Sequence, residues 1–471
     1  MPAAITVSPR SARIDVERAI TLTGFDPGAR VTLTAISRLA DHTVWQSANV
    51  YVANAQGVVS IADQAPVRGD YEGIDSQGPL WSQVLQSTEA AAEVAADAAD
   101  AANAANAADP SRVTRAPSAS SVPSAPDAQT VPNAPAGPAD PIAVWLTATD
   151  ETGHVARSTL EQRYQDDGVT RVALDEDGLV GALYLPATSG PHPAIIVLNG
   201  SGGGVNEARA ALLASHGYAA LALGYFGAPG LPDYLSEIAL EYFQRAIDWL
   251  RATARPAKGF VAVSGHSRGG ELSLLLGSLF PEAVDAVVAY VPSAVVHGVL
   301  NAGRPGEGRF KPAWTLAGQP VAHVWENNAA QDWSAVDTLP EPRRQAQAFV
   351  RAQQDTAAVS RSRIAVERIA GPVLLLSAGD DGYWPSSDYA REVARRLHDA
   401  GHPHVVKHVD YPDAGHALQA PTVPTTQIAR AHAVSGIVLT GGGSAAANAR
   451  ANRESWQEVL TFLRAAVAAH A

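Results

Sequence analysis

Cysteine is absent from the 471 residues of this chain, and methionine occurs once. Without cysteine there is no disulfide, no thiolate metal site and no thiol nucleophile. Runs of lysine and arginine are missing as well, and the formal net charge is -13, which excludes a nucleic-acid-binding surface built on clustered cations. A substrate with negative charge therefore needs a local basic pocket.

Long apolar segments are also missing. No apolar run reaches the roughly 18 residues needed to cross a bilayer, and Met1 to Val7 lack a basic stretch followed by an apolar one. We therefore expect no membrane span and a cytoplasmic protein. Apolar residues still make up 46% of the chain and charged residues 17%, which is enough apolar surface for a sizeable core. The length alone suggests two or three domains, and we expect two.

The N-terminal part alternates apolar and polar side chains over residues 5 to 65, a pattern typical of antiparallel β-structure. From about 89 to 140 the sequence becomes Ala-rich and then rich in Ser and Pro, so we expect a helix in Ala90 to Ala108 and a flexible remainder. Strand-like alternation resumes at Ile142 to Thr147. The biased stretch is therefore predicted to be an insertion, acting as a passive spacer, within a β domain of residues 1–166.

Residues 167–471 show buried apolar runs that alternate with helical patterns, which indicates a mostly parallel sheet covered on both faces. A hairpin with its turn at Asp177-Gly178 opens this part. The expected strands after it are Ala194 to Leu198, Tyr218 to Leu223, Phe260 to Val263, Ala286 to Tyr290, Val373 to Leu376 and Val405 to Val409. The expected helices are Leu235 to Arg251, Gly269 to Leu279, Tyr389 to Ala400 and Glu454 to Ala468.

Ser267 stands in the sequence Gly265-His266-Ser267-Arg268-Gly269, between an expected strand and an expected helix. This is the setting in which an α/β-hydrolase raises its serine above the sheet on a sharp turn. Gly265 and Gly269 suit the turn because side chains there would collide with the neighbouring strand and helix. We predict that Ser267 is the nucleophile of a serine hydrolase; the alternative is an ordinary serine at a Gly-rich helix entry.

A serine nucleophile needs a base and an orienting acid, which follow in the order Ser, Asp, His in this fold. His416, just after the last expected strand, is the candidate base. Asp380 and Asp381 both follow the strand that ends near Leu376, and either could reach the histidine. We choose Asp381, and the alternative role of Asp380 is to bond backbone amides of its own turn. Three further histidines are interpreted as solvated or packed rather than as metal ligands, and no metal or cofactor is predicted: His402, His404 and His408.

The tetrahedral intermediate of such a reaction needs preorganised donors for its oxyanion. One is expected to be the backbone N–H of Arg268, directly after the nucleophile. The second is expected from Gly202 or Gly203, in the Gly-rich loop Asn199 to Gly204. The same glycines could cradle a nucleotide phosphate, but the lysine of a P-loop and a clear dinucleotide motif are missing.

Together these motifs resemble the acyl-CoA thioesterases and bile acid-CoA:amino acid N-acyltransferases. The similar segments occur in the same order as in that family: Tyr71 to Trp81, Gly202 to Gly204, Leu240 to Phe243, Ser267 to Gly270, Asp380 to Trp384 and Tyr411 to His416. The resemblance implies an α/β fold class, with an N-terminal immunoglobulin-like β-sandwich followed by a C-terminal α/β-hydrolase domain. It also implies that the second aspartate of the pair, Asp381, is the triad acid.

The resemblance further implies hydrolysis of an acyl-CoA thioester through a serine acyl-enzyme. The family's nucleophile is serine in the thioesterases and often cysteine in the amino acid conjugating enzymes, so Ser267 favours transfer to water over transfer to an amine. An acyltransferase, or a carboxylesterase or dienelactone-type hydrolase acting on non-CoA esters, is the alternative. Three arginines are candidate contacts for CoA phosphates, with ordinary surface charges as the alternative: Arg209, Arg268 and Arg304.

Residues 297 to 363 form a longer stretch than the resemblance implies. The stretch contains Trp314, Trp325 and Trp333, and lies between two expected strands of the sheet. It could form a lid over the acyl site, or it could be a surface excursion packed by its own tryptophans. Both interpretations stay open at the level of the sequence.

Overall fold

The computed structural model describes residues 2–39, 43–87 and 140–470. The chain divides into two compact units, the first ending at Arg163 and the second beginning at Tyr164, shortly before the predicted boundary between residues 166 and 167. The helix expected at Ala90 to Ala108 and nearly all of the predicted insertion lie outside the described residues.

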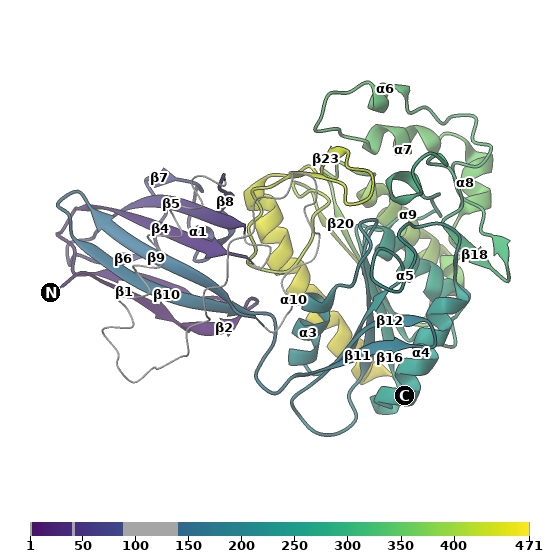
Figure 1. The fold of residues 1–471 in the computed structure, drawn as a ribbon, viewed down its shortest axis with the longest axis horizontal. Helices are drawn as coiled ribbons and strands as arrows, with labels where there is room; N and C mark the ends of the chain where they lie inside the picture. The colour runs from purple at the N-terminus through teal and green to yellow at the C-terminus, as the bar shows by residue number, and fades with distance from the viewer. Residues whose placement is uncertain (1, 40–42, 88–139, 471) are drawn as a thin grey trace, which may run out of the picture. The chain divides into compact units, whose positions relative to one another are not determined.

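The first unit consists of two β-sheets (Figure 1). The smaller has the order β1 (Ala4–Ser8), β3 (Ala19–Thr23), β6 (Val59–Ser60). The larger runs β2 (Ser11–Arg13), β10 (Val155–Arg163), β9 (Ile142–Asp150), β4 (Arg30–Arg38), β5 (Val44–Val52), β7 (Arg68–Gly69), and β8 (Val84–Leu85) also pairs with β5.

Side chains alternate in these strands as the sequence predicts. Val31, Leu33 and Ala35 of β4 are buried, and the threonines between them are partly exposed, because successive residues of a strand point to opposite faces. Strands β8 and β9 lie on either side of residues 88–139 in the chain, and both belong to the larger sheet. The segment between them therefore connects two strands of one sheet.

The family-like segment Tyr71 to Trp81 ends in the short helix α1 (Gly78–Trp81) and packs on itself. A Cβ atom at Gly78 would lie 2.2 Å from Cζ of Tyr71, so only glycine fits beneath that ring. The Trp81 indole N–H donates to Oδ2 of Asp75 at 2.9 Å, and the Tyr71 hydroxyl bonds the Tyr51 hydroxyl at 2.7 Å. This motif serves the packing of the first unit.

The second unit is built on an eight-stranded sheet in which every neighbouring pair from β14 to β21 is parallel. Strands β11 and β12 extend it by antiparallel pairing. Two strands have the predicted bounds, β13 and β17. The order is β11 (Thr170–Glu176), β12 (Leu179–Leu185), β14 (Ala219–Gly224), β13 (Ala194–Leu198), β16 (Val261–His266), β17 (Ala286–Tyr290), β20 (Val373–Ala378), β21 (Val406–Tyr411).

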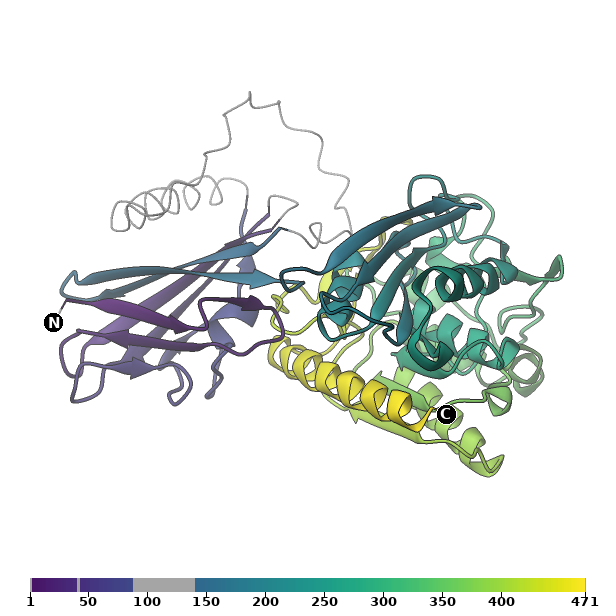
Figure 2. The same ribbon diagram turned by 90° about the horizontal axis from the view of Figure 1, so that it is seen from below.

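Helices cover both faces of this sheet (Figures 1 and 2). The main ones are α3 (Glu207–Ser215), α4 (Glu241–Ala254), α5 (Arg268–Leu279), α9 (Ser386–Asp399) and α10 (Ala445–Ala469). Helices α3 and α10 are neighbours, since the guanidinium of Arg209 lies 5.6 Å from the ring centroid of Trp456. Across the described part of the chain, no helix combines the length and the apolar character needed to cross a membrane.

The largest errors in the predicted helices are at two helix starts. The helix expected from Leu235 begins at Glu241, because Ile238–Ala239 forms strand β15 and pairs with β18 (Trp314–Leu316), far along the chain. The last helix begins at Ala445 instead of Glu454. Ser444 caps it, and its hydroxyl accepts a hydrogen bond from the backbone N–H of Ala447 at 3.2 Å.

Residues 297 to 363 fold over several short elements: β18, β19 (Gln319–Pro320), α6 (Ser334–Asp337), α7 (Ala346–Ala352) and α8 (Thr356–Ser362). Trp314, Trp325 and Trp333 are all buried, and the rings of the last two lie 5.3 Å apart. Trp325 and Trp333 therefore pack this stretch internally, as one of the two interpretations proposed, whereas the ring of Trp314 packs against Tyr225 and Phe243 outside it.

Candidate active site

Four loops that follow parallel strands build the site. Ser267 follows β16, Asp381 follows β20, His416 follows β21, and the Gly-rich loop follows β13. The carboxyl ends of parallel strands lie at one edge of the sheet, where ligands of α/β proteins bind. Residues far apart in the sequence therefore converge there.

Ser267 sits on a strained turn between β16 and α5. Its backbone angles are φ 59° and ψ -119°, a region that residues with side chains rarely adopt and that is often found at functional sites. A Cβ atom at Gly265 would lie 2.1 Å from the carbonyl oxygen of Gly269, and one at Gly269 would lie 2.5 Å from the carbonyl oxygen of Asn199. Both glycines are therefore needed for the helix to approach the strands this closely.

A continuous chain of hydrogen bonds joins the three predicted catalytic side chains. Oγ of Ser267 lies 2.7 Å from Nε2 of His416, and Nδ1 of His416 lies 2.8 Å from Oδ2 of Asp381. A carboxylate only accepts, so Nδ1 carries the proton and Nε2 presents its lone pair to the serine hydroxyl. The backbone N–H groups of Tyr383 and Trp384 also donate to Asp381, at 2.8 and 3.2 Å, which fixes the carboxylate.

The two candidate aspartates have different surroundings. Asp381 is 4% exposed and bonds His416, whereas the Asp380 side chain is 47% exposed and points elsewhere. Its oxygens lie 2.6 Å from Nη2 of Arg344 and 2.7 Å from the backbone N–H of Gly443. The structure therefore brings only Asp381 to the histidine, and Asp380 bonds a backbone amide of another loop.

Ser267 opens into a pocket of about 350 Å³, a volume that includes the part open to solvent. Its lining residues are Ser201, Ser267, Arg268, Leu300, Asn301, Gln345, Phe349, Tyr383, Trp384 and His432. Four of them come from residues 297 to 363, and within that group the Asn301 amide donates to Oε1 of Gln345 at 2.9 Å. The stretch thus supplies one wall of the pocket as well as its own tryptophan core.

The predicted oxyanion donors are only partly placed beside Ser267. Arg268 is the first residue of α5, so its N–H has no acceptor within the helix, and it lines the pocket. The N–H of Gly203 instead donates to the carbonyl of Gly200 at 3.2 Å, and neither Gly202 nor Gly203 borders the pocket. Ser201 does border it, so its backbone N–H is a further candidate for the second donor.

Two protein-family models match the sequence. The description "Acyl-CoA thioester hydrolase/BAAT N-terminal region" matches residues 15–104, and "BAAT / Acyl-CoA thioester hydrolase C terminal" matches residues 238–469. Human acyl-coenzyme A thioesterase 1 is 31% identical over 345 residues, which cover 70% of this chain and 74% of the relative. The chain belongs to this family. Rat acyl-coenzyme A thioesterase 1 is 28% identical over 457 residues, 95% of this chain and 93% of the relative.

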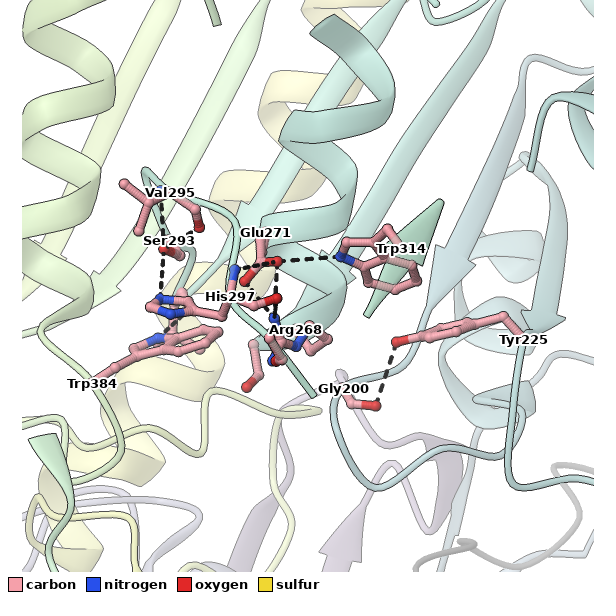
Figure 3. Close-up of polar contacts among 12 residues, drawn as sticks. Gly200, Tyr225, Arg268, Glu271, Ser293, Val295, His297, Trp314 and Trp384 are labelled. Atoms are coloured by element: carbon pink, nitrogen blue, oxygen red, sulfur yellow. Dashed lines mark hydrogen bonds and ion pairs between the residues drawn. The ribbon is translucent and has the colours of Figure 1, made fainter. Parts of the chain in front are cut away.

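The side chain of Arg268 takes part in a buried network of hydrogen bonds, which Figure 3 shows. Its guanidinium lies 2.9 Å from the Glu271 carboxylate and donates to the carbonyls of His297 and Gly298. The backbone N–H of His297 and the Trp314 indole N–H also donate to Glu271, at 3.2 and 3.4 Å. In this thioesterase-family chain the Arg268 guanidinium is therefore committed to the core and is not free to contact CoA.

The other candidate arginines differ from one another. Arg209 is 9% exposed and lies 4.2 Å from the ring centroid of Tyr290, whereas the Arg304 side chain is 61% exposed and pairs with Glu307. The interpretation as surface charges is therefore wrong for Arg209 and Arg268, and it fits Arg304.

Two ring side chains that the sequence analysis left without a role hold His416 in place. Nε2 of His266 donates to the backbone carbonyl of His416 at 2.8 Å, and burial lowers the pKa of His266 to about 3, so this ring is neutral. The ring of Tyr383 stacks on the His416 imidazole at 4.4 Å with an angle of 19°. The only sequence signal for either residue is its position beside a motif residue.

Proposed function

We propose that this protein hydrolyses acyl-CoA thioesters to a free acid and CoA, through an acyl-enzyme on Ser267. One observation carries the proposal. In a chain of the acyl-CoA thioesterase family, Ser267, His416 and Asp381 are joined by hydrogen bonds, and Ser267 faces an open pocket. The arrangement has the roles required for acyl transfer, which are a nucleophile, a base and a group that fixes the base.

In the first half of the reaction, Oγ of Ser267 attacks the thioester carbonyl carbon while Nε2 of His416 takes the hydroxyl proton. Asp381 keeps the other proton on Nδ1 and stabilises the imidazolium that forms. The oxygen of the tetrahedral intermediate is held by the backbone N–H groups of Arg268 and Ser201. When the C–S bond breaks, the imidazolium gives its proton to the CoA thiolate.

In the second half, water replaces the thiol. His416 takes a proton from the water as its oxygen attacks the acyl-enzyme carbonyl, and it returns that proton to Oγ of Ser267 as the acid leaves. The absence of cysteine from the chain favours this hydrolytic outcome. A serine acyl-enzyme can also pass its acyl group to an amine or an alcohol, and the same triad can open a simple ester.

A panel of acyl-CoA substrates tests the proposal, with CoA release followed by a free-thiol reagent. Aryl esters are run beside it, and glycine or taurine is added in a parallel series. We expect CoA release that Ser267→Ala abolishes, with the free acid as the product. Ester cleavage without CoA release would overturn the thioesterase assignment, and an acyl-glycine or acyl-taurine product would replace hydrolysis by transfer.

A further inference from the structure

A second serine and a second histidine face the same pocket as Ser267. Ser201 lies in the loop after β13, and His432 lies directly after the short strand β22 (Ala429–Ala431). Nε2 of His432 is 2.9 Å from Oγ of Ser201. The residue before Ser201, Gly200, abuts the nucleophile: a Cβ atom there would lie 3.3 Å from Cβ of Ser267.

The surroundings of His432 decide which ring nitrogen carries its proton. Nδ1 faces two backbone N–H groups, those of Val434 at 3.3 Å and Ser435 at 3.4 Å. Both groups only donate, so Nδ1 holds its lone pair and Nε2 holds the proton. The ring is 7% exposed, and burial lowers its pKa to about 4, so it is neutral near pH 7. His432 therefore donates to Ser201, and Oγ of Ser201 accepts.

This assignment leaves the proton of the Ser201 hydroxyl to be placed. Over the part of the chain that the structure describes, the recorded partner of this hydroxyl is His432, which offers it no acceptor. Ser201 lines the pocket together with Ser267 and Arg268. The hydroxyl proton is consequently free to meet an oxygen atom of a bound acyl group.

We propose that the Ser201 hydroxyl is a third donor to the oxyanion, in addition to the backbone N–H groups of Ser201 and Arg268, and that His432 orients it. The inference rests on the proposed acyl transfer at Ser267. No proton is transferred: the O–H bond of Ser201 stays intact, and its hydrogen bond strengthens as the substrate carbonyl oxygen gains negative charge. Ser201 is thus a catalytic residue, and His432 is a positioning residue.

The test measures kcat and KM separately for Ser201→Ala, Ser201→Thr and His432→Gln. Ser435→Ala is the matched control, because it removes an exposed hydroxyl from the same hairpin and keeps the backbone N–H that bonds His432. We expect Ser201→Ala to lower kcat by about 10²-fold, in the range found for loss of one oxyanion donor, with KM nearly unchanged. Ser201→Thr and His432→Gln, which keep a hydroxyl and a donor, should retain more activity than Ser201→Ala.

A transition-state analogue gives a second readout that does not depend on turnover. A trifluoromethyl ketone forms a hemiketal oxyanion with the serine. An alkyl-CoA thioether has no carbonyl group at that position and forms no oxyanion. Ser201→Ala should weaken inhibition by the ketone about as much as it lowers kcat and leave binding of the thioether unchanged. Equal kcat in Ser201→Ala and wild type, or equal loss for both inhibitors, would overturn the proposal.

The aryl-ester arm separates this inference from the thioesterase assignment. If the protein cleaves esters and not acyl-CoA, the assignment fails, and the Ser201 test proceeds on kcat for the ester. Circular dichroism of each variant shows whether it has folded. If Ser201→Ala does not fold, the ratio of kcat values between His432→Gln and His432→Phe replaces it, and equal values contradict an orienting role.

Discussion

Two consecutive residues, Ser267 and Arg268, place their side chains in different surroundings: Oγ of Ser267 bonds His416 at the pocket, and the Arg268 guanidinium bonds buried groups of the core. On the pocket side, Ser267 borders a solvent-open pocket. It is also the first member of a series of hydrogen bonds, through which its proton can pass to His416. On the core side, Arg268 and Glu271 are about 1% and 0% exposed, and their recorded partners are protein groups. The pocket side can change its protonation during a reaction, whereas the core side is fully committed to fixed partners.

The buried side of the turn helps to hold the strained backbone of the nucleophile. A non-glycine residue at φ 59° persists only where the surroundings determine the backbone. The buried pair ties the first turn of α5 to the loop at His297 and Gly298, and the glycines let the helix approach the strands. Substitutions on the pocket side should therefore remove activity and largely preserve stability, while substitutions on the core side should lower stability.

The largest expected effect is that of Ser267→Ala on turnover. Loss of the nucleophile should lower kcat by about 10⁴- to 10⁶-fold, as in other serine hydrolases. The free energy of unfolding should change by only about 1 kcal/mol, because alanine keeps the Cβ atom and a single hydrogen bond, to Nε2 of His416, is lost. Thiol release and denaturant unfolding measure the two quantities. A variant that is both active and destabilised would abolish the distinction between the two sides.

Asp381→Asn is expected to come next, with Asp380→Asn as its matched control. An asparagine can hold His416 in the wrong tautomer, and the corresponding change in other triads lowers kcat by about 10⁴-fold. Asp380 does not touch the histidine and bonds Arg344 at the surface, so its variant should stay within about tenfold of wild type, as expected for an exposed ion pair. The reverse order of the two kcat values would assign the triad acid to Asp380.

Glu271→Ala tests the core side. Removing one partner of a buried ion pair typically costs about 3–5 kcal/mol of stability, because the other charge is left buried and unpaired. The double variant Arg268→Met/Glu271→Leu should recover only part of this loss. It removes the unpaired charge, but the N–H groups of His297 and Trp314 and the carbonyls of His297 and Gly298 lose their partners. The variant keeps the backbone N–H of residue 268. Arg395→Ala, in an exposed pair with Glu392, should cost less than about 1 kcal/mol. Equal losses for Glu271→Ala and Arg395→Ala would show that the buried network contributes no more than a surface pair.

Short sequence motifs predicted the turn that carries the nucleophile and the three side chains of the hydrogen-bonded series. Gly265 and Gly269 marked the turn, and the order of Ser267, Asp381 and His416 along the chain identified the residues that the structure brings together. Arg268 and Glu271 are spaced i, i+3 on α5, a signal for the buried pair that the sequence analysis did not use.

Contacts between distant segments could not be predicted in this way. Strand β15 forms only because Ile238 meets Trp314, so the helical pattern from Leu235 was misleading. In the Gly-rich loop, the N–H of Gly203 is used in a hydrogen bond to the carbonyl of Gly200. The amino-acid composition of the loop does not predict this bond. His432 carries no motif at all, and only the fold brings it to Ser201.

Buried histidines on the pocket side and on the core side should both lower the stability of the protein in acid, so the two sides do not differ in this respect. Burial lowers the pKa of His432 on the pocket side to about 4 and that of His297 on the core side well below its usual value. In the unfolded chain a histidine takes its proton near pH 6.5. Between pH 6.5 and 4 the unfolded state therefore binds more protons, so stability is complete above pH 6.5 and falls as the pH is lowered.

The size of this effect for His432 is about 2 kcal/mol at pH 5, the free energy of protonating one unfolded histidine with a pKa of 6.5 at that pH. Unfolding free energies of wild type and His432→Gln at pH 7.5 and pH 5.0 measure it. The drop between the two pH values should be about 2 kcal/mol smaller in the variant, because glutamine does not titrate. His297→Gln should reduce the drop in the same direction. An unchanged drop in His432→Gln would mean that its ring is protonated in the folded protein at pH 5, and a protonated ring cannot accept at Nδ1 from Val434 and Ser435.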